Sequence, residues 1–286
     1  MTARLDAVLA VLLTACHALS PPLSGTGSSA EIRWRAHPGT PMVVAMTFDE
    51  LVAEGESVPV EGWDFSWFEG RASEQRPSWG YAKLLAARAA EVDAVLDVQT
   101  GGGEVLATIP RPPRLLVATE SWPPNLSVAQ RNLAPLGGVV VHAPDDGPLP
   151  FADATFDLVV ARHPVRTPWD EVGRVLKPGG AFLSQQVGMG SVHELADFVT
   201  GPRPVGDDRA PDRVAAEARA AGLTVVDLRP ETLRVEFFDV AAVVHFLRKV
   251  IWIVPGFTVA AYATAWRRCT STSPARARSS PTRPGS

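Results

Sequence analysis

The sequence is poor in cysteine and in clustered metal ligands. It has two cysteines among 286 residues, Cys16 and Cys269, and each lies near one end of the chain. This excludes a disulfide framework or a cysteine-rich metal site as the organising feature of the fold. We expect no metal ion, and we expect a reducing, cytoplasmic compartment.

The sequence also lacks an excess of basic residues and a long uninterrupted apolar run. Lys and Arg total 27 against 31 Asp and Glu, for a net charge of -4, whereas nucleic-acid binders are usually basic. Residues 250–266 are apolar, but Pro255 and Gly256 interrupt them and the run is short for a bilayer. We predict buried helices or a lid there rather than a membrane span.

Both ends of the chain differ in composition from its middle. An apolar run at 5–13 followed by Cys16 is similar to a lipoprotein signal. The alternative, which we favour, starts the native chain at Met46, where an acidic helical pattern begins. Residues 1–45 are then a non-native or disordered extension. Residues 266–286 are rich in Arg, Ser and Pro, so they cannot build a core, and we predict a disordered tail.

Between these ends, helical and strand-like patterns alternate, which is typical of an α/β, doubly wound sheet with helices on both faces. We expect a cap or helical segment over 46–92 and the main domain over 93–265. Apolar runs predict strands at 94–98, 115–119, 138–142, 156–161, 181–185 and 223–238. Helical periodicity predicts helices at 81–92, 125–134, 169–176, 192–199, 211–221 and 240–254.

A strand running into a glycine-rich turn is the central feature. The run begins at Asp97, and Gly101 and Gly103 follow, with a helix expected after the turn. Glycines there let the backbone approach a ligand closely. A nicotinamide-binding turn is the rival interpretation, but Asp97 and the presence of Leu106 where a third glycine belongs argue against it. The run resembles the first motif of class I S-adenosylmethionine (SAM) methyltransferases and departs from it at Gln99.

Further segments resemble the same family in order and spacing. Glu120 ends the second strand of the motif region, where the family's acid binds both ribose hydroxyls. Asp145 matches the residue that contacts the adenine amino group, and Asp146 is the neighbour that would substitute for it; a solvated turn is the other interpretation of this pair. Residues 149–153, 156–160 and 176–180 complete a resemblance to the methyltransferase type 11 group that covers about 94–185.

This resemblance implies a SAM site and a sheet that ends with an antiparallel strand between its fifth and sixth strands. No strand pattern follows residue 257, so that last strand is predicted to be missing. A shifted reading frame of G/C-rich codons in the tail would encode a helix and a strand, which favours a frameshift. The cofactor-binding residues that the resemblance implies are Asp97, Gln99, Thr100, Gly101, Gly103, Glu120, Ser121, Asp145, Asp146 and Arg162.

Residues near the reacting centre are less clearly marked. His163 follows the fourth strand of the motif region and is a candidate general base, although packing over the cofactor is the simpler interpretation. Gln185 ends the fifth strand and is a candidate for substrate binding. Trp67, Trp79 and Tyr81 belong to an aromatic stretch that is expected either to cap the pocket or to cover the sheet.

The function implied is transfer of a methyl group from SAM to a small-molecule acceptor, with RNA disfavoured by the net charge. Since the cofactor is already activated, the protein mainly positions the reactants. The alternatives are a degenerate SAM-fold protein without activity and a nicotinamide-dependent oxidoreductase. The pattern indicates neither the acceptor nor the oligomeric state.

Overall fold

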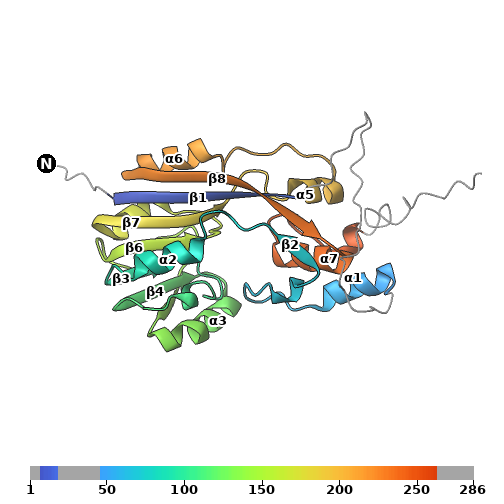
Figure 1. The fold of residues 1–286 in the computed structure, drawn as a ribbon, viewed down its shortest axis with the longest axis horizontal. Helices are drawn as coiled ribbons and strands as arrows, with labels where there is room; N and C mark the ends of the chain where they lie inside the picture. Colours follow the sequence, from blue (N-terminus) through green and yellow to red (C-terminus); the bar gives the residue numbers. More distant parts are fainter. Residues whose placement is uncertain (1–6, 19–45, 263–286) are drawn as a thin grey trace, which may run out of the picture.

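The computed structural model describes residues 7–18 and 46–262 (Figure 1). Within them the chain forms an eight-stranded sheet in the order β2-β8-β1-β7-β6-β3-β4-β5. The predicted α/β doubly wound fold is confirmed. Five parallel strands at its centre and one edge are β3 (Ala94–Asp97), β4 (Leu115–Glu120), β5 (Val139–His142), β6 (Phe156–Arg162) and β7 (Leu176–Val187).

Helices cover both faces of this sheet because its inner strands are apolar on both sides. Val95 and Leu96 on β3 point to opposite faces, and both are fully buried. Helices α2 (Tyr81–Ala89) and α3 (Pro123–Leu133) pack on the Val95 face. Helices α4 (Trp169–Val175) and α6 (Pro211–Ala220) pack on the Leu96 face.

A third apolar cluster lies beyond the end of the sheet where β8 (Leu223–Phe237) passes into α7 (Val240–Lys249) (Figure 1). It joins α7 to α1 (Phe48–Ser57) and α5 (His193–Thr200). Helix α1 is the acidic helix predicted after Met46. It begins with a capping box, in which Thr47 and Glu50 satisfy each other's backbone N–H groups. The short strand β2 (Ala72–Glu74) pairs antiparallel with β8.

Strand β1 (Ala7–Ala18) differs from the prediction that residues 1–45 lie outside the fold. Its backbone runs between β7 and β8, parallel to both. This is the position at which the family resemblance places an antiparallel strand. No antiparallel strand lies there among the described residues, which end at 262. The N-terminal strand pairs with the two edges that the absent strand would otherwise leave open.

Two local predictions fail in the loops. The helix expected after the glycine-rich turn is wrong, because only the 3-10 turn η2 (Leu106–Thr108) lies between β3 and β4. Pro110, Pro112 and Pro113 follow it and cannot donate the hydrogen bonds that a helix needs. Strand β7 begins earlier than expected, and residues 177–180 form an irregularity within it. The two other 3-10 turns are η1 (Ser66–Phe68) and η3 (Ala134–Leu136).

The segment after α7 turns back onto the third cluster, where Val254 is buried. In the part of the chain that the structure describes, no helix is both long enough and apolar enough to cross a bilayer. The predicted tail at 266–286 and Cys269 lie outside the described residues.

Candidate active site

Three strands bring charged residues to one edge of the sheet. Asp97 ends β3, Glu120 ends β4 and Arg162 ends β6. The parallel register pairs Asp97 with Ala118 and Val160, so Glu120 and Arg162 each lie two residues beyond the level of Asp97. Ligands of open α/β sheets bind at this edge, beyond the carboxyl ends of the strands.

Asp97 is almost fully buried. Its side chain is 7% exposed, and the Thr100 hydroxyl donates a hydrogen bond of 2.7 Å to Oδ2. Burial raises the pKa of Asp97 to about 7, and the nearby Glu120 carboxylate adds to the rise against the hydrogen bond from Thr100. Asp97 therefore changes its charge close to neutral pH.

The glycine-rich turn follows directly. Gly101 and Gly103 adopt positive φ values of 65° and 74°, which a side chain would strain. The Gly101 N–H donates to Glu120 Oε2 over 2.8 Å, and the Thr100 N–H donates to the Thr119 carbonyl over 2.9 Å. These bonds tie the turn to the end of β4.

Glu120 serves as the anchor of this turn. Besides Gly101, the N–H groups of Ser121 and Trp122 donate to its Oε1 at 3.0 and 2.8 Å. Burial nevertheless raises the pKa of Glu120 above its usual value, and the charge of Asp145 raises it further. Asp145 and Asp146 are the two predicted adenine contacts, and Asp145 is thus the one that lies near Glu120. Asp145 is half-buried, whereas Asp146 is exposed.

Gln99, which departs from the family's glycine, has a structural role in a left-handed conformation with φ of 57°. Its side-chain Oε1 accepts from the Val165 N–H at 2.7 Å, and its Nε2 donates to the Arg166 carbonyl at 2.7 Å. A longer bond of 3.5 Å reaches the Asp145 carbonyl. The amide therefore tethers two loops that border the candidate site, which a glycine cannot do.

Arg162 lies with two buried aromatic side chains on the α2 side of the sheet. Burial lowers the pKa of its guanidinium, while the nearby Glu74 and Asp97 carboxylates raise it. The hydroxyl of Tyr81, which interacts electrostatically with Arg162 and Asp97, is buried without a hydrogen-bond partner. The indole N–H of Trp79 is also buried and unpartnered. Buried hydroxyl and indole donors normally have an acceptor, and a carboxylate suits both of them as well as the guanidinium.

His163 and Gln185 lie together at the ends of β6 and β7. The Gln185 Nε2 donates to His163 Nε2 at 2.9 Å, which assigns the ring proton to Nδ1. Burial, reinforced by Arg162 and Arg209, lowers the pKa of His163 to about 3. A ring with this pKa takes up no proton near neutral pH, which argues against the general-base interpretation.

The aromatic cap residues divide into two groups. Trp67 packs edge-on against His245 at 4.9 Å, under the guanidinium of Arg71 at 4.4 Å, and so lies in the cap itself. Trp63 lies on the glycine-rich turn instead, because a Cβ on Gly101 would overlap its indole. Sequence reasoning selected Trp67 and missed Trp63, although both occur in the same aromatic stretch.

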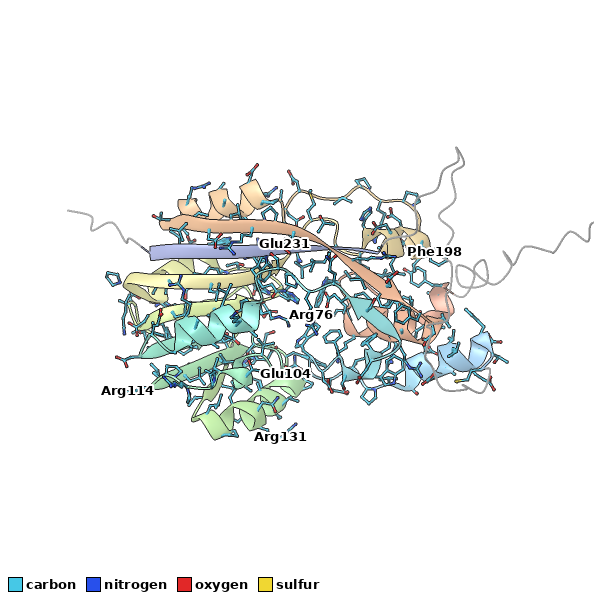
Figure 2. The ribbon with its side chains drawn as sticks, in the orientation of Figure 1. Arg76, Glu104, Arg114, Arg131, Phe198 and Glu231 are labelled. Carbon is cyan, nitrogen blue, oxygen red and sulfur yellow. The ribbon has the colours of Figure 1, made fainter. Side chains whose placement is uncertain are left out.

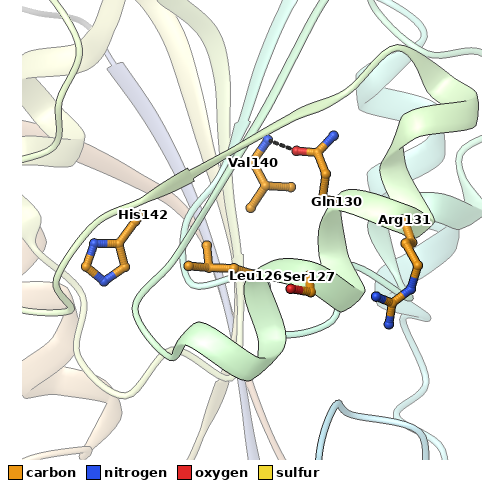
Figure 3. A pocket seen from close by; sticks show the side chains of 6 residues that line it. All are labelled: Leu126, Ser127, Gln130, Arg131, Val140 and His142. Atoms are coloured by element: carbon orange, nitrogen blue, oxygen red, sulfur yellow. Dashed lines mark hydrogen bonds between the residues drawn. The ribbon is translucent and has the colours of Figure 1, made fainter.

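A shallow groove lies between α3 and β5 (Figure 3). It contains none of the charged residues at the strand ends. Within residues 46–262, no group of three or more His, Cys, Asp or Glu side chains is placed to hold a metal ion. The groove is lined by Leu126, Ser127, Gln130, Arg131, Val140 and His142.

Comparison with known proteins agrees with the geometry of the glycine-rich turn. Residues 96–184 match the methyltransferase domain family. The matched segment, which runs from β3 into β7, is thus similar to the cofactor-binding domain of class I SAM-dependent methyltransferases. SAM is the cofactor of the family, and the acids at the ends of β3 and β4 and the unpartnered donors beside Arg162 are chemically suited to its polar groups.

The individual relatives of this chain are distant. A malonyl-[acyl-carrier protein] O-methyltransferase from Marinomonas sp. is 26% identical over 171 residues, which are 56% of this chain and 63% of the relative. The chain thus spans less than two thirds of that relative's length. A solved putative methyltransferase from Bacillus halodurans is 28% identical over 41% of this chain and 55% of its own, with a TM-score of 0.34. A putative sarcosine dimethylglycine methyltransferase from Galdieria sulphuraria is 15% identical over 66% of this chain and 77% of its own, with a TM-score of 0.42.

Proposed function

We propose that this methyltransferase binds SAM at the carboxyl ends of β3, β4 and β6 and transfers its methyl group to a small-molecule acceptor. The observation that carries the proposal is the joint placement of Asp97, Glu120 and Arg162 around a glycine-rich turn. Residues 46–92 form a cap over the main domain, 93–265, in this proposal.

Each part of the cofactor has a suitable group at this edge. Glu120 is assigned to the ribose hydroxyls, and Asp145 to the adenine amino group. The ammonium of the methionine end suits Asp97, which carries charge above pH 7. The carboxylate of the same end suits the Arg162 guanidinium and the Tyr81 hydroxyl, and that hydroxyl is buried without a hydrogen-bond partner. When bound, SAM supplies the activated methyl group, and these residues orient it.

The acceptor in this proposal is a nucleophile that needs no base from the protein. His163, the histidine at this edge, is held neutral with its Nε2 occupied by Gln185. A carboxylate is already ionised at neutral pH and meets this requirement. The relative from Marinomonas is named for O-methylation of a malonyl group, which agrees with a carboxylate acceptor. The net charge of -4 weighs against RNA.

The test is a transfer assay with the full chain and methyl-labelled SAM. The candidate acceptors are carboxylic acids, amines and phenols of similar size, and label transfer to each is measured. We expect labelled methyl esters from the acids, with little label on the amines and phenols. Transfer to amines alone would contradict the acceptor class. SAM binding without transfer to any class would favour a cofactor-binding protein that has lost activity.

A further inference from the structure

The place where a ligand approaches the glycine-rich turn is filled by the protein's own Trp63. A glycine in such a turn leaves space because it has no side chain. At Gly101 that space holds the Trp63 indole, closely enough that a Cβ would overlap it. The Gly101 N–H is also taken by Glu120, so the turn has both its surface and its donor occupied from within the chain.

A small set of polar contacts holds Trp63 there. The backbone N–H of Trp63 donates to Glu104 Oε1 at 3.1 Å, and the carboxylate of Glu104 folds back over Gly102. The neighbouring Gly62 N–H donates to the buried Asn125 Oδ1 at 3.0 Å. Figure 2 shows Glu104 at the boundary between the sheet and the aromatic segment. These contacts connect the cap to the turn through two side chains, so a modest movement can release them.

The indole also belongs to an aromatic group outside the turn. Trp63 stacks on Phe65 with the ring centroids 5.8 Å apart and contacts Trp252 at 5.5 Å. The Lys249 ammonium donates to the carbonyls of Val60 and Glu61 at 3.3 and 3.5 Å. The segment therefore has a second set of partners away from the turn, at the end of α7 and just after it.

We propose that Trp63 is an internal competitor for the cofactor: its indole closes the Gly101 turn in the free protein and withdraws with the cap when SAM binds. This proposal rests on the proposed function, since it assigns a regulatory contact to the same site. The chain alternates between a closed form, as described here, and an open form that binds SAM. A ligand that binds only the open form has its apparent affinity reduced by the open fraction.

The test measures SAM association with the full chain by stopped-flow tryptophan fluorescence and SAM affinity by calorimetry. In the unsubstituted protein, the observed rate should level off at high SAM concentration, at the rate of opening. In Trp63→Ala the rate should rise linearly, and the dissociation constant should fall by about tenfold if about one molecule in ten is open. Glu104→Ala, which frees the Trp63 N–H, should act in the same direction and guards against a folding defect in the first variant. Trp169→Phe, on the opposite face of the sheet, is the control and should behave as the unsubstituted protein does.

Weaker SAM binding by Trp63→Ala would show that the indole supports the cofactor, and it would overturn the proposal. Equal rates and affinities in all variants, with SAM binding intact, would overturn the competition alone. Absence of SAM binding in every variant would overturn the proposed function and this inference together. An association rate that is linear with the same slope in the unsubstituted protein and in Trp63→Ala would also contradict a closed form.

Discussion

Asp97 is predicted to reduce the stability of the free protein near neutral pH, and Asp97→Asn to remove that cost. Burial raises the pKa of the carboxyl from 3.8 to about 7. At about 1.36 kcal/mol per pKa unit, the shift of roughly three units corresponds to an upper value of about 4 kcal/mol. Relaxation of the native state reduces the measured effect, so we expect roughly 1–4 kcal/mol.

The sign follows from proton binding. Because the folded pKa is raised, the folded protein keeps a proton on Asp97 between about pH 4 and pH 7, where the unfolded chain has lost it. The free energy of unfolding therefore falls as pH rises through this window, and the full cost is present above pH 7. Asparagine has the shape of the protonated acid and can still accept from Thr100.

The assay is urea unfolding of the SAM-free protein and of Asp97→Asn at pH 5 and pH 8. The variant should gain stability that is larger at pH 8 than at pH 5, while its SAM affinity falls. Asp157→Asn is the matched control and should instead lose stability. The hydrogen bonds from Lys177 and the Ala94 N–H lower the pKa of Asp157, so its charged form stabilises the folded protein. A variant that is less stable than the unsubstituted protein at pH 8 would refute the reasoning on burial.

Three further predictions concern the site and the sheet. Glu120→Ala should weaken SAM binding by more than tenfold in calorimetry, since hydrogen bonds to a charged group are worth about 1.5–3 kcal/mol each; Asp153→Ala, at a side chain 78% exposed, should leave it unchanged, and equal losses would refute the assignment. Deleting residues 1–18 should lower the melting temperature by about 10 °C or more, or cause aggregation, because β7 and β8 lose the strand between them. Deleting residues 1–6 is the control. An unchanged melting temperature for the longer deletion would contradict the role of β1. His163→Asn should slow transfer without moving its pH profile between about pH 5.5 and 8, because the His163 pKa of about 3 lies below that range; a profile that loses a limb near pH 6.5 would restore the general-base role.

The strands of the sheet were predictable from apolar runs of the right length. Residues 94–98, 116–119 and 158–161 carry side chains that are buried on both faces, which is the pattern of inner parallel strands. The register was not predictable, but the loop after each strand identified the edge that holds the site. This is why Asp97 and Glu120 could be placed near each other before the fold was known.

The parts that failed depend on contacts between distant segments. Strand β1 pairs with the edges of β7 and β8. An apolar run at 7–18 does not by itself indicate that two distant strands have free edges. Gln99 bridges to Val165 and Arg166, 66 and 67 residues away, which a local motif cannot indicate. Trp63 and Trp67 are equivalent as aromatic residues of one stretch, and only the packing places Trp63 on Gly101.

The missing helix after the glycine-rich turn had a visible cause in the sequence. Pro110, Pro112 and Pro113 follow η2 within a few residues, and together they prevent a helix of ordinary length. The resemblance to the methyltransferase motif outweighed these prolines in the prediction. The turn therefore lacks the N-terminus of a long helix beside it, and its polar surroundings come from Glu120 and Asp97 instead.

The central claim is that the carboxyl ends of β3, β4 and β6 form a SAM site, and calorimetric titration of the full chain with SAM tests it most directly. The parallel titration uses NAD under the same conditions. We predict saturable binding of SAM at one site per chain, loss of that binding in Glu120→Ala, and no binding of NAD. Saturable binding of NAD without binding of SAM at millimolar concentration would contradict the account.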